Sequence, residues 1–260
     1  MKYPKGQPMS DNVFRALQLA GKIGFLSRAL WYDYFATGEL RWRQEQLALL
    51  IERGLIARHS NTAVKDYFVL TAKSQSLLEN HNFITVSPAP IVQVVHDESV
   101  VRWLLRLEAE GLSDDWETEP EFKRKQTEEY QLSRDIRKQK YPDAVFKVTA
   151  LGKKRIFAIE YERTRKSNDR YKDILWLYSR SSMFGMVIFV CENELIQSAI
   201  EGRIKYLNIA SLWDRIAIAR ADDWHSNPAK APLRLENKII TLGEICEKGE
   251  SKKIAATIAA

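Results

Sequence analysis

Three carboxylates lie where strand-like segments of this sequence begin or end. Glu160 and Glu162 close the apolar run Ile156–Ile159, and Asp143 follows a proline at the start of the preceding strand-like segment. Residues two apart in a strand point to the same face of a sheet, so Glu160 and Glu162 should project together. A short turn at 151–154 predicts an antiparallel hairpin, which brings Asp143 to the same end of the sheet as Glu160.

Carboxylates held this close repel one another unless a cation lies among them. Hard divalent cations such as Mg²⁺ and Mn²⁺ prefer oxygen ligands. Asp143, Glu160 and Glu162 are therefore predicted to bind Mg²⁺ or Mn²⁺ and to be catalytic. The alternative is that Glu160 and Glu162 are solvated residues at a strand end, paired with the basic loop that follows them.

The elements that must position these carboxylates alternate between strands and helices in the second part of the chain. We expect one domain over 91–225, because strands alternating with helices are typical of a central mixed sheet with helices on both faces. The predicted class is α/β (α+β). The expected helices are 97–110, 169–179 and 194–206, and the expected strands are 143–150, 155–161, 183–190 and 215–220.

The first part of the chain reads as helices followed by a hairpin, and we expect a domain over 10–80. Its predicted elements are helices from Ser10 or Asp11 to Ile23, over 26–35 and over 39–53, strands over 55–58 and 66–71, and a helix over 72–79. Arg41, Arg43 and Gln44 lie in the first turns of the third helix. They can be DNA contacts or solvated side chains of an ordinary small helical domain.

Composition limits the possible partners and surroundings. The net charge is +6, and residues 1–90 carry 11 Lys and Arg against 7 Asp and Glu, which favours contact with a polyanion. The longest apolar run, 183–191, is about half of the roughly 20 residues that span a bilayer, so no membrane insertion is expected. Two cysteines are typical of a reducing, cytoplasmic setting. Residues 81–90, with two prolines, are the expected linker, and 226–260 form a C-terminal tail.

The segments "YPDAVF" and "FAIEYE" resemble the acidic motifs of the PD-(D/E)xK nuclease superfamily, whose core is a restriction-endonuclease-like mixed sheet flanked by helices. The resemblance implies that Asp143, Glu160 and Glu162 are its acidic triad. Glu162 stands where that family has its lysine, so the resemblance implies a lysine on the next helix. Lys172 is favoured over Lys166 for this catalytic role, because it falls in the first turns of that helix.

The N-terminal element order, with "ERGLIARH" and "YFVLTAKS", resembles the winged helix-turn-helix fold. In that fold the third helix enters the major groove and the hairpin loop contacts the phosphate backbone. The resemblance implies that Arg41, Arg43 and Gln44 contact DNA from the third helix and that Lys65 does so from the wing. The basic segment with Arg163, Arg165 and Lys166 is a further candidate for phosphate contact.

The two parts together resemble the MobC-type relaxases of mobilisable plasmids and the related replication-relaxation proteins. The resemblance implies an endonuclease that nicks one strand of double-stranded DNA at a transfer origin, with conjugation or mobilisation proteins as partners. Water is favoured over a tyrosine as the nucleophile, since Tyr161 should point away from the acidic face. The alternatives are a DNA-binding accessory protein or repressor with an inactive nuclease-like domain, and a restriction-type endonuclease that cuts both strands.

Overall fold

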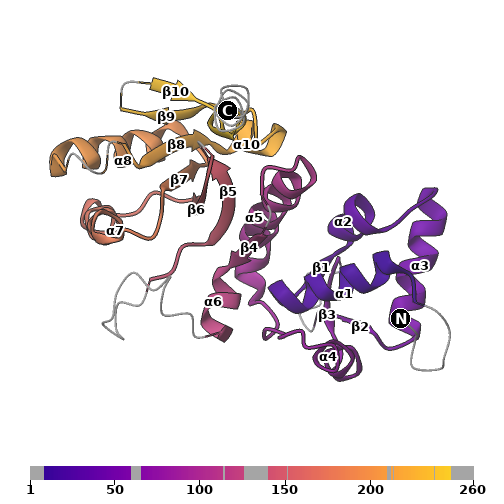
Figure 1. Cartoon of the computed structure of the whole chain (residues 1–260). Helices are drawn as coiled ribbons and strands as arrows, with labels where there is room; N and C mark the ends of the chain where they lie inside the picture. The colour runs from indigo at the N-terminus through magenta and orange to yellow at the C-terminus, as the bar shows by residue number, and fades with distance from the viewer. Residues whose placement is uncertain are drawn as a thin grey trace. The chain divides into compact units, whose positions relative to one another are not determined.

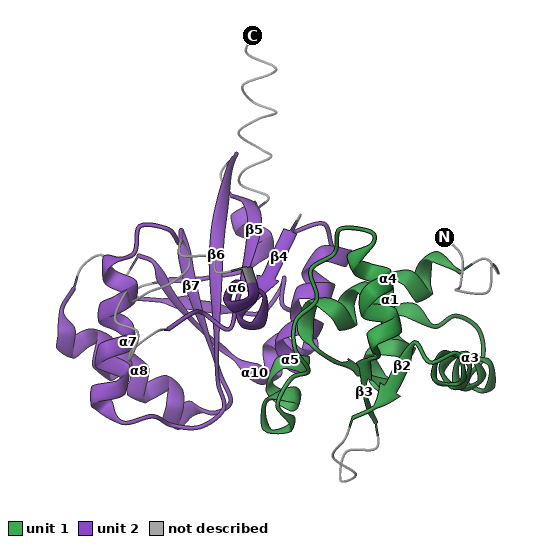
Figure 2. Cartoon of the chain, turned by 90° about the horizontal axis from the view of Figure 1, so that it is seen from below, with its two compact units in different colours: residues 1–98 green, residues 99–260 purple. Residues whose placement is uncertain are grey.

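The chain folds into two compact units, Met1–Glu98 and Ser99–Ala260, called unit 1 and unit 2 here (Figure 2). The computed structural model describes residues 9–59, 66–113, 115–125, 140–150, 152–209, 212, 214–236 and 238–246. The mixed α/β class predicted from the sequence is confirmed. Among the described residues, no helix combines the length and the apolar character that crossing a bilayer requires.

Unit 1 packs its helices around a three-stranded antiparallel sheet of order β1-β3-β2. Its elements are α1 (Asp11–Ile23), β1 (Leu26–Ser27), α2 (Arg28–Leu30), the π-helix η1 (Trp31–Phe35), α3 (Leu40–Glu52), β2 (Ile56–Arg58), β3 (Tyr67–Leu70) and α4 (Ala72–Glu79). The helix predicted over 26–35 is present from Arg28 to Phe35, as α2 followed by η1, but the prediction is wrong for its first two residues, which form β1. Leu26 and Ser27 pair with Phe68 and Tyr67 of β3, and this tertiary pairing takes them out of the helix.

The two ends of α1 show how local sequence signals determine where a helix begins and ends. The Ser10 side chain accepts a hydrogen bond from the Val13 backbone at the start, and Gly24 ends the helix with φ +84°, which favours glycine. The predicted linker 81–90 has no helix or strand, but it packs inside unit 1, where the Val86 amide donates to Gly21 O at 2.8 Å.

Unit 2 is built on a seven-stranded mixed sheet of order β10-β9-β8-β7-β6-β5-β4. Strands β6, β7 and β8 are parallel to one another, and the remaining pairs are antiparallel. Its elements are α5 (Ile91–Ala109, which begins in unit 1), β4 (Asp115–Thr118), α6 (Glu119–Lys125), β5 (Ala144–Ala150), β6 (Lys153–Glu162), α7 (Asn168–Arg180), β7 (Met186–Cys191), α8 (Glu194–Leu207), β8 (Ile216–Arg220), α10 (Ala221–Ser226), β9 (Leu233–Leu235) and β10 (Lys238–Ile240).

Helices cover both faces of this sheet, with α7 and α8 on one face and α5 and α10 on the other (Figure 1). The alternation of β6 follows these layers. Tyr161 faces α5 and α10, where its ring lies 4.8 Å from that of Trp103. Glu160 and Glu162 project to the opposite face, toward α7. Because β6 is buried on both faces, its two carboxylates need partners inside the protein.

Candidate metal-dependent active site

The site is built at the end of β6, where Glu160 and Glu162 are each about 1% exposed. Strand β5 pairs antiparallel with β6, with Ala144 opposite Ile159, so the predicted hairpin is confirmed. Asp143 immediately precedes β5 and extends this pairing, because its amide donates to Ile159 O at 3.1 Å. The hairpin therefore brings the third carboxylate next to Glu160.

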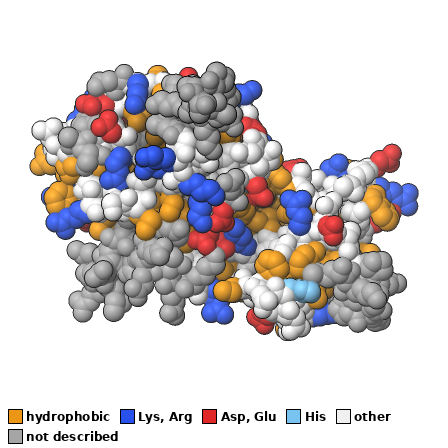
Figure 3. Space-filling model, viewed as in Figure 1, with side chains coloured by type: hydrophobic (Ala, Val, Ile, Leu, Met, Phe, Trp, Pro, Cys, Tyr) orange, Lys and Arg blue, Asp and Glu red, His pale blue; other side chains and the backbone are white. Residues whose placement is uncertain are grey.

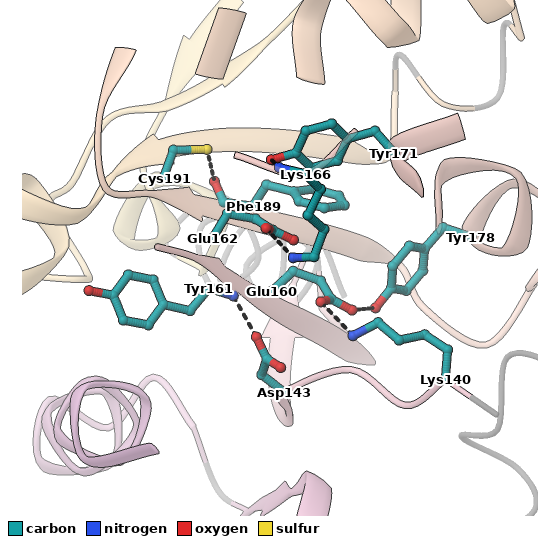
Figure 4. Close-up of polar contacts among 10 residues, drawn as sticks. All are labelled: Lys140, Asp143, Glu160, Tyr161, Glu162, Lys166, Tyr171, Tyr178, Phe189 and Cys191. Carbon is teal, nitrogen blue, oxygen red and sulfur yellow. Dashed lines mark hydrogen bonds and ion pairs between the residues drawn. The ribbon is translucent and has the colours of Figure 1, made fainter. Parts of the chain in front are cut away.

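Asp143 has a structural contact as well as a position beside the glutamates. Its Oδ2 accepts a hydrogen bond of 2.7 Å from the Tyr161 amide, as Figure 4 shows. The Asp143 carboxylate thus accepts the hydrogen bond of the Tyr161 amide just before β5 begins, where a backbone carbonyl of a longer strand would otherwise accept it. This contact fixes the orientation of Asp143 relative to β6.

Glu160 is held by two side chains from different parts of unit 2. Lys140 Nζ donates to Glu160 Oε2 at 2.8 Å, and the Tyr178 hydroxyl, on α7, donates to Oε1 (Figure 4). The Lys140 side chain is only 16% exposed. Sequence analysis did not identify Lys140 because it precedes β5 in a segment without strand or helix periodicity. The signal in the sequence that points to Lys140 is its position three residues before Asp143.

Glu162 is paired with Lys166, which lies on the link between β6 and α7. Lys166 Nζ contacts Glu162 Oε2, and the Lys166 amide donates to the Tyr171 hydroxyl at 3.3 Å. The other carboxylate oxygen, Glu162 Oε1, is buried and has no hydrogen-bond partner among the described residues. A buried acceptor without a partner is destabilising, and a bound cation would satisfy it.

Burial and mutual repulsion set the protonation of the cluster. Burial raises the pKa of Glu160 to about 7, opposed by Lys140 and assisted by Asp143. Burial also raises the pKa of Glu162, opposed by Lys166. Burial lowers the pKa of Lys140, but Glu160 and Asp143 outweigh it and raise that pKa above its ordinary value. Burial raises the pKa of Tyr178, and the negative charge of Glu160 raises it further. The hydroxyl therefore stays protonated and remains a hydrogen-bond donor.

The structure separates the other residues predicted for this site. Lys172 lies on the exposed side of α7, because the buried face of that helix is formed by residues including Tyr171 and Tyr178. Lys140 and Lys166, rather than Lys172, contact the carboxylates. Arg163 and Arg165 are exposed on the link between β6 and α7. Figure 3 shows Lys and Arg side chains interspersed with acidic ones over the visible surface, rather than gathered in one stripe.

Of the residues predicted to bind DNA in unit 1, Arg41 and Gln44 are exposed to solvent, whereas Arg43 is hydrogen-bonded within the protein. The Arg41 side chain is 90% exposed and pairs with Glu45 at 3.0 Å, and Gln44 is exposed as well. Arg43 instead holds the turn before α3, donating to Gly38 O at 2.8 Å and to Tyr32 O at 2.9 Å. Lys65 lies outside the described residues.

The donor set fits a divalent cation in residue type. Within the described ranges, no three or more His, Cys, Asp and Glu side chains are arranged as a ready metal site. The three carboxylates nevertheless supply the oxygen ligands that Mg²⁺ and Mn²⁺ prefer. Glu162 Oε1 has no hydrogen-bond partner within the described ranges, and the positive charge beside the two glutamates is supplied by the ammonium groups of Lys140 and Lys166.

Comparison with known protein families, with curated proteins and with solved structures finds no match to this chain. The side-chain geometry of unit 2 is therefore the basis of the functional proposal.

Proposed function

We propose that this protein is a metal-dependent DNA-nicking enzyme, in which unit 1 binds double-stranded DNA and unit 2 cuts one strand. The observation that carries the proposal is the convergence of Asp143, Glu160 and Glu162 at one end of a buried hairpin, where a buried oxygen of Glu162 has no hydrogen-bond partner in the part of the chain that the structure describes. Buried carboxylates that repel one another are destabilising by themselves, so a catalytic role accounts for their arrangement better than stability does.

The order of elements in unit 2 supports a phosphodiester-cleaving core of the PD-(D/E)xK type. Helix α5, the antiparallel hairpin β5–β6, helix α7 and the parallel strand β7 occur in the order of that core, with β4 and α6 inserted between α5 and β5. The acids lie at the start of β5 and the end of β6, as in that superfamily. Only the lysine differs, since Glu162 occupies its position.

In this proposal Asp143, Glu160 and Glu162 would hold Mg²⁺ or Mn²⁺. Such an ion lowers the pKa of a bound water and neutralises charge on the scissile phosphate. Lys140 holds Glu160 in place, and Tyr178 fixes the same carboxylate from α7. Tyr161 is turned away, toward α5, with its hydroxyl donating to Glu192 Oε2 at 2.6 Å. Water is therefore the nucleophile that this proposal uses.

Unit 1 supports the DNA-binding half of the proposal. Three helical segments, a β2–β3 hairpin and α4, with β1 completing the sheet, follow the order of a winged helix-turn-helix. Arg41 and Gln44 are exposed in the first turns of α3, where base or phosphate contacts would be made. Arg163 and Arg165 would contact phosphate near the cut. The resemblance to MobC-type relaxases extends the proposal to a plasmid transfer origin and to mobilisation proteins as partners.

The test uses a supercoiled plasmid that carries the DNA flanking this gene. Purified protein is incubated with it, with and without Mg²⁺ or Mn²⁺, beside a Glu160→Gln/Glu162→Gln variant. Asp173→Asn, which removes an exposed carboxylate on α7, is the matched control. We expect open circles only with metal, from the unaltered chain and the control alone. Linear product would indicate a restriction-type endonuclease instead.

One observation favours a second function, a DNA-binding accessory protein or repressor with an inactive unit 2. Each buried glutamate is already paired with one lysine ammonium, so much of the cluster's negative charge is balanced within the protein. Plasmid binding by the unaltered chain, with no relaxation at any metal concentration, would establish this second function.

A further inference from the structure

Lys140 and Lys166 are not equivalent partners of the acidic cluster. The Lys140 side chain is 16% exposed, and its ammonium is attracted by Asp143 and Glu119 in addition to Glu160. The Lys166 side chain is 36% exposed and follows three exposed residues, 163–165. Its ammonium can therefore turn into solvent by side-chain rotation, whereas that of Lys140 would have to leave a buried position.

The glutamates differ in the same way. Glu160 has both oxygens hydrogen-bonded, by Lys140 and Tyr178. Glu162 has one oxygen on Lys166, while Oε1 has no partner among the described residues. A cation that reaches the cluster therefore finds an available acceptor at Glu162, and Lys166 is the group beside it.

Charge counting identifies which state is balanced. Above pH 7, where the Glu160 carboxyl is ionised, three carboxylates and the two ammonium groups leave one negative charge in the cluster. Adding a divalent cation to this set would leave one positive charge, which is unfavourable in a buried site. The three carboxylates with the divalent cation and Lys140 alone are neutral. One ammonium should therefore leave when the metal enters.

We propose that Lys166 is a tethered cation that occupies the metal position at Glu162 and is displaced when Mg²⁺ or Mn²⁺ binds. The inference rests on the proposed metal-dependent function of the same cluster. Displacement places the Lys166 ammonium in solvent beside Arg163 and Arg165, where it adds a third positive charge for contact with DNA phosphate. Metal binding and DNA contact are coupled in this way through one side chain.

The first test measures Mn²⁺ binding to the DNA-free protein by calorimetry. Lys166→Met keeps the aliphatic stem and removes the competing ammonium, and Lys172→Met is the matched control on the exposed side of α7. We expect Lys166→Met to bind Mn²⁺ about tenfold more tightly than the unaltered chain, which corresponds to about 1.4 kcal/mol. The control should bind as the unaltered chain does. Equal or weaker binding by Lys166→Met would overturn the proposal.

The second test needs no variant and so does not depend on how Lys166→Met folds. A short pulse of acetic anhydride labels accessible amines, and mass spectrometry reports the labelling of each lysine. We expect Mn²⁺ to increase the labelling of Lys166 several-fold and to leave that of Lys172 unchanged. Unchanged or reduced labelling of Lys166 would overturn the exchange.

The two proposals fail separately. Cation exchange at Lys166 without any plasmid nicking would retain the inference and overturn the proposed cleavage. Metal-dependent nicking without exchange would retain the cleavage and overturn the inference.

Discussion

Replacing Lys140 by methionine isolates the charge that holds Glu160 in the core of unit 2. The ammonium lies 2.8 Å from Glu160 Oε2. At an effective dielectric constant of about 20, two unit charges at this distance attract by about 6 kcal/mol before desolvation is counted. Lys140 favours the ionised form of Glu160, so its loss should raise the pKa of this carboxyl well above 7. Glu160 in Lys140→Met should therefore stay protonated across the neutral range.

The expected destabilisation depends on pH. The pKa of Glu160 is about 7 in the folded protein, above its unfolded value of 4.5, so its proton stabilises the fold at low pH and that contribution is lost as pH rises through 7. At about pH 5.5 the carboxyl is protonated with or without Lys140, and the variant loses a hydrogen bond of about 1 kcal/mol. Above pH 7 the difference should grow by about 1.4 kcal/mol per pH unit, reaching about 3 kcal/mol near pH 8.5.

Urea unfolding followed by the fluorescence of the tryptophans in unit 2, including buried Trp103 and Trp224, measures this difference at both pH values. Lys172→Met should show almost no change in unfolding free energy at either pH. The unfolding free energy of the double variant Lys140→Met/Glu160→Gln should lose the pH dependence that Glu160 contributes, because no ionisable carboxyl remains at that position. Equal destabilisation of Lys140→Met at both pH values would refute the reasoning.

Four further predictions concern single residues. Arg43→Ala should lower the unfolding free energy of unit 1 by about 1–3 kcal/mol in urea titrations, because two backbone oxygens lose their donor. Arg41→Ala should leave stability unchanged and weaken DNA binding, measured by fluorescence anisotropy. Gly24→Ala should lower the melting temperature, with a penalty of about 2 kcal/mol, since φ is +84° and the new Cβ would lie 2.5 Å from a backbone oxygen. Tyr161→Phe should destabilise unit 2 by about 1 kcal/mol in urea but retain any nicking, because its hydroxyl bonds Glu192, away from the acidic cluster; loss of nicking would instead implicate the hydroxyl in catalysis.

Elements with strong local signals could be predicted from the sequence. Apolar spacing and a terminal glycine predict the third helix over 39–53, which is α3, and strand-like apolar runs predict β5 and β6. The short elements β4 and α6 were not predicted. Their few residues carry little periodic signal, and β4 is defined by its pairing with β5. Helix α5 begins at Ile91 rather than 97, directly after the segment that contains Pro88 and Pro90.

The sequence alone determined that Glu160 and Glu162 share a face, since a strand alternates its side chains whatever surrounds it. It also determined that Asp143 joins them, because a short turn between two strands leaves antiparallel pairing as the local solution. Only the tertiary structure decided that Lys140 meets Glu160 and that Lys172 does not reach these acids. Lys140 reaches Glu160 from a segment without periodicity, and Lys172 faces solvent because α7 buries its opposite side. The contact of Lys140 and the position of Lys172 depend on how helices and strands pack in space, and no spacing along the chain encodes them, whereas Lys166 and Glu162 meet within one local segment.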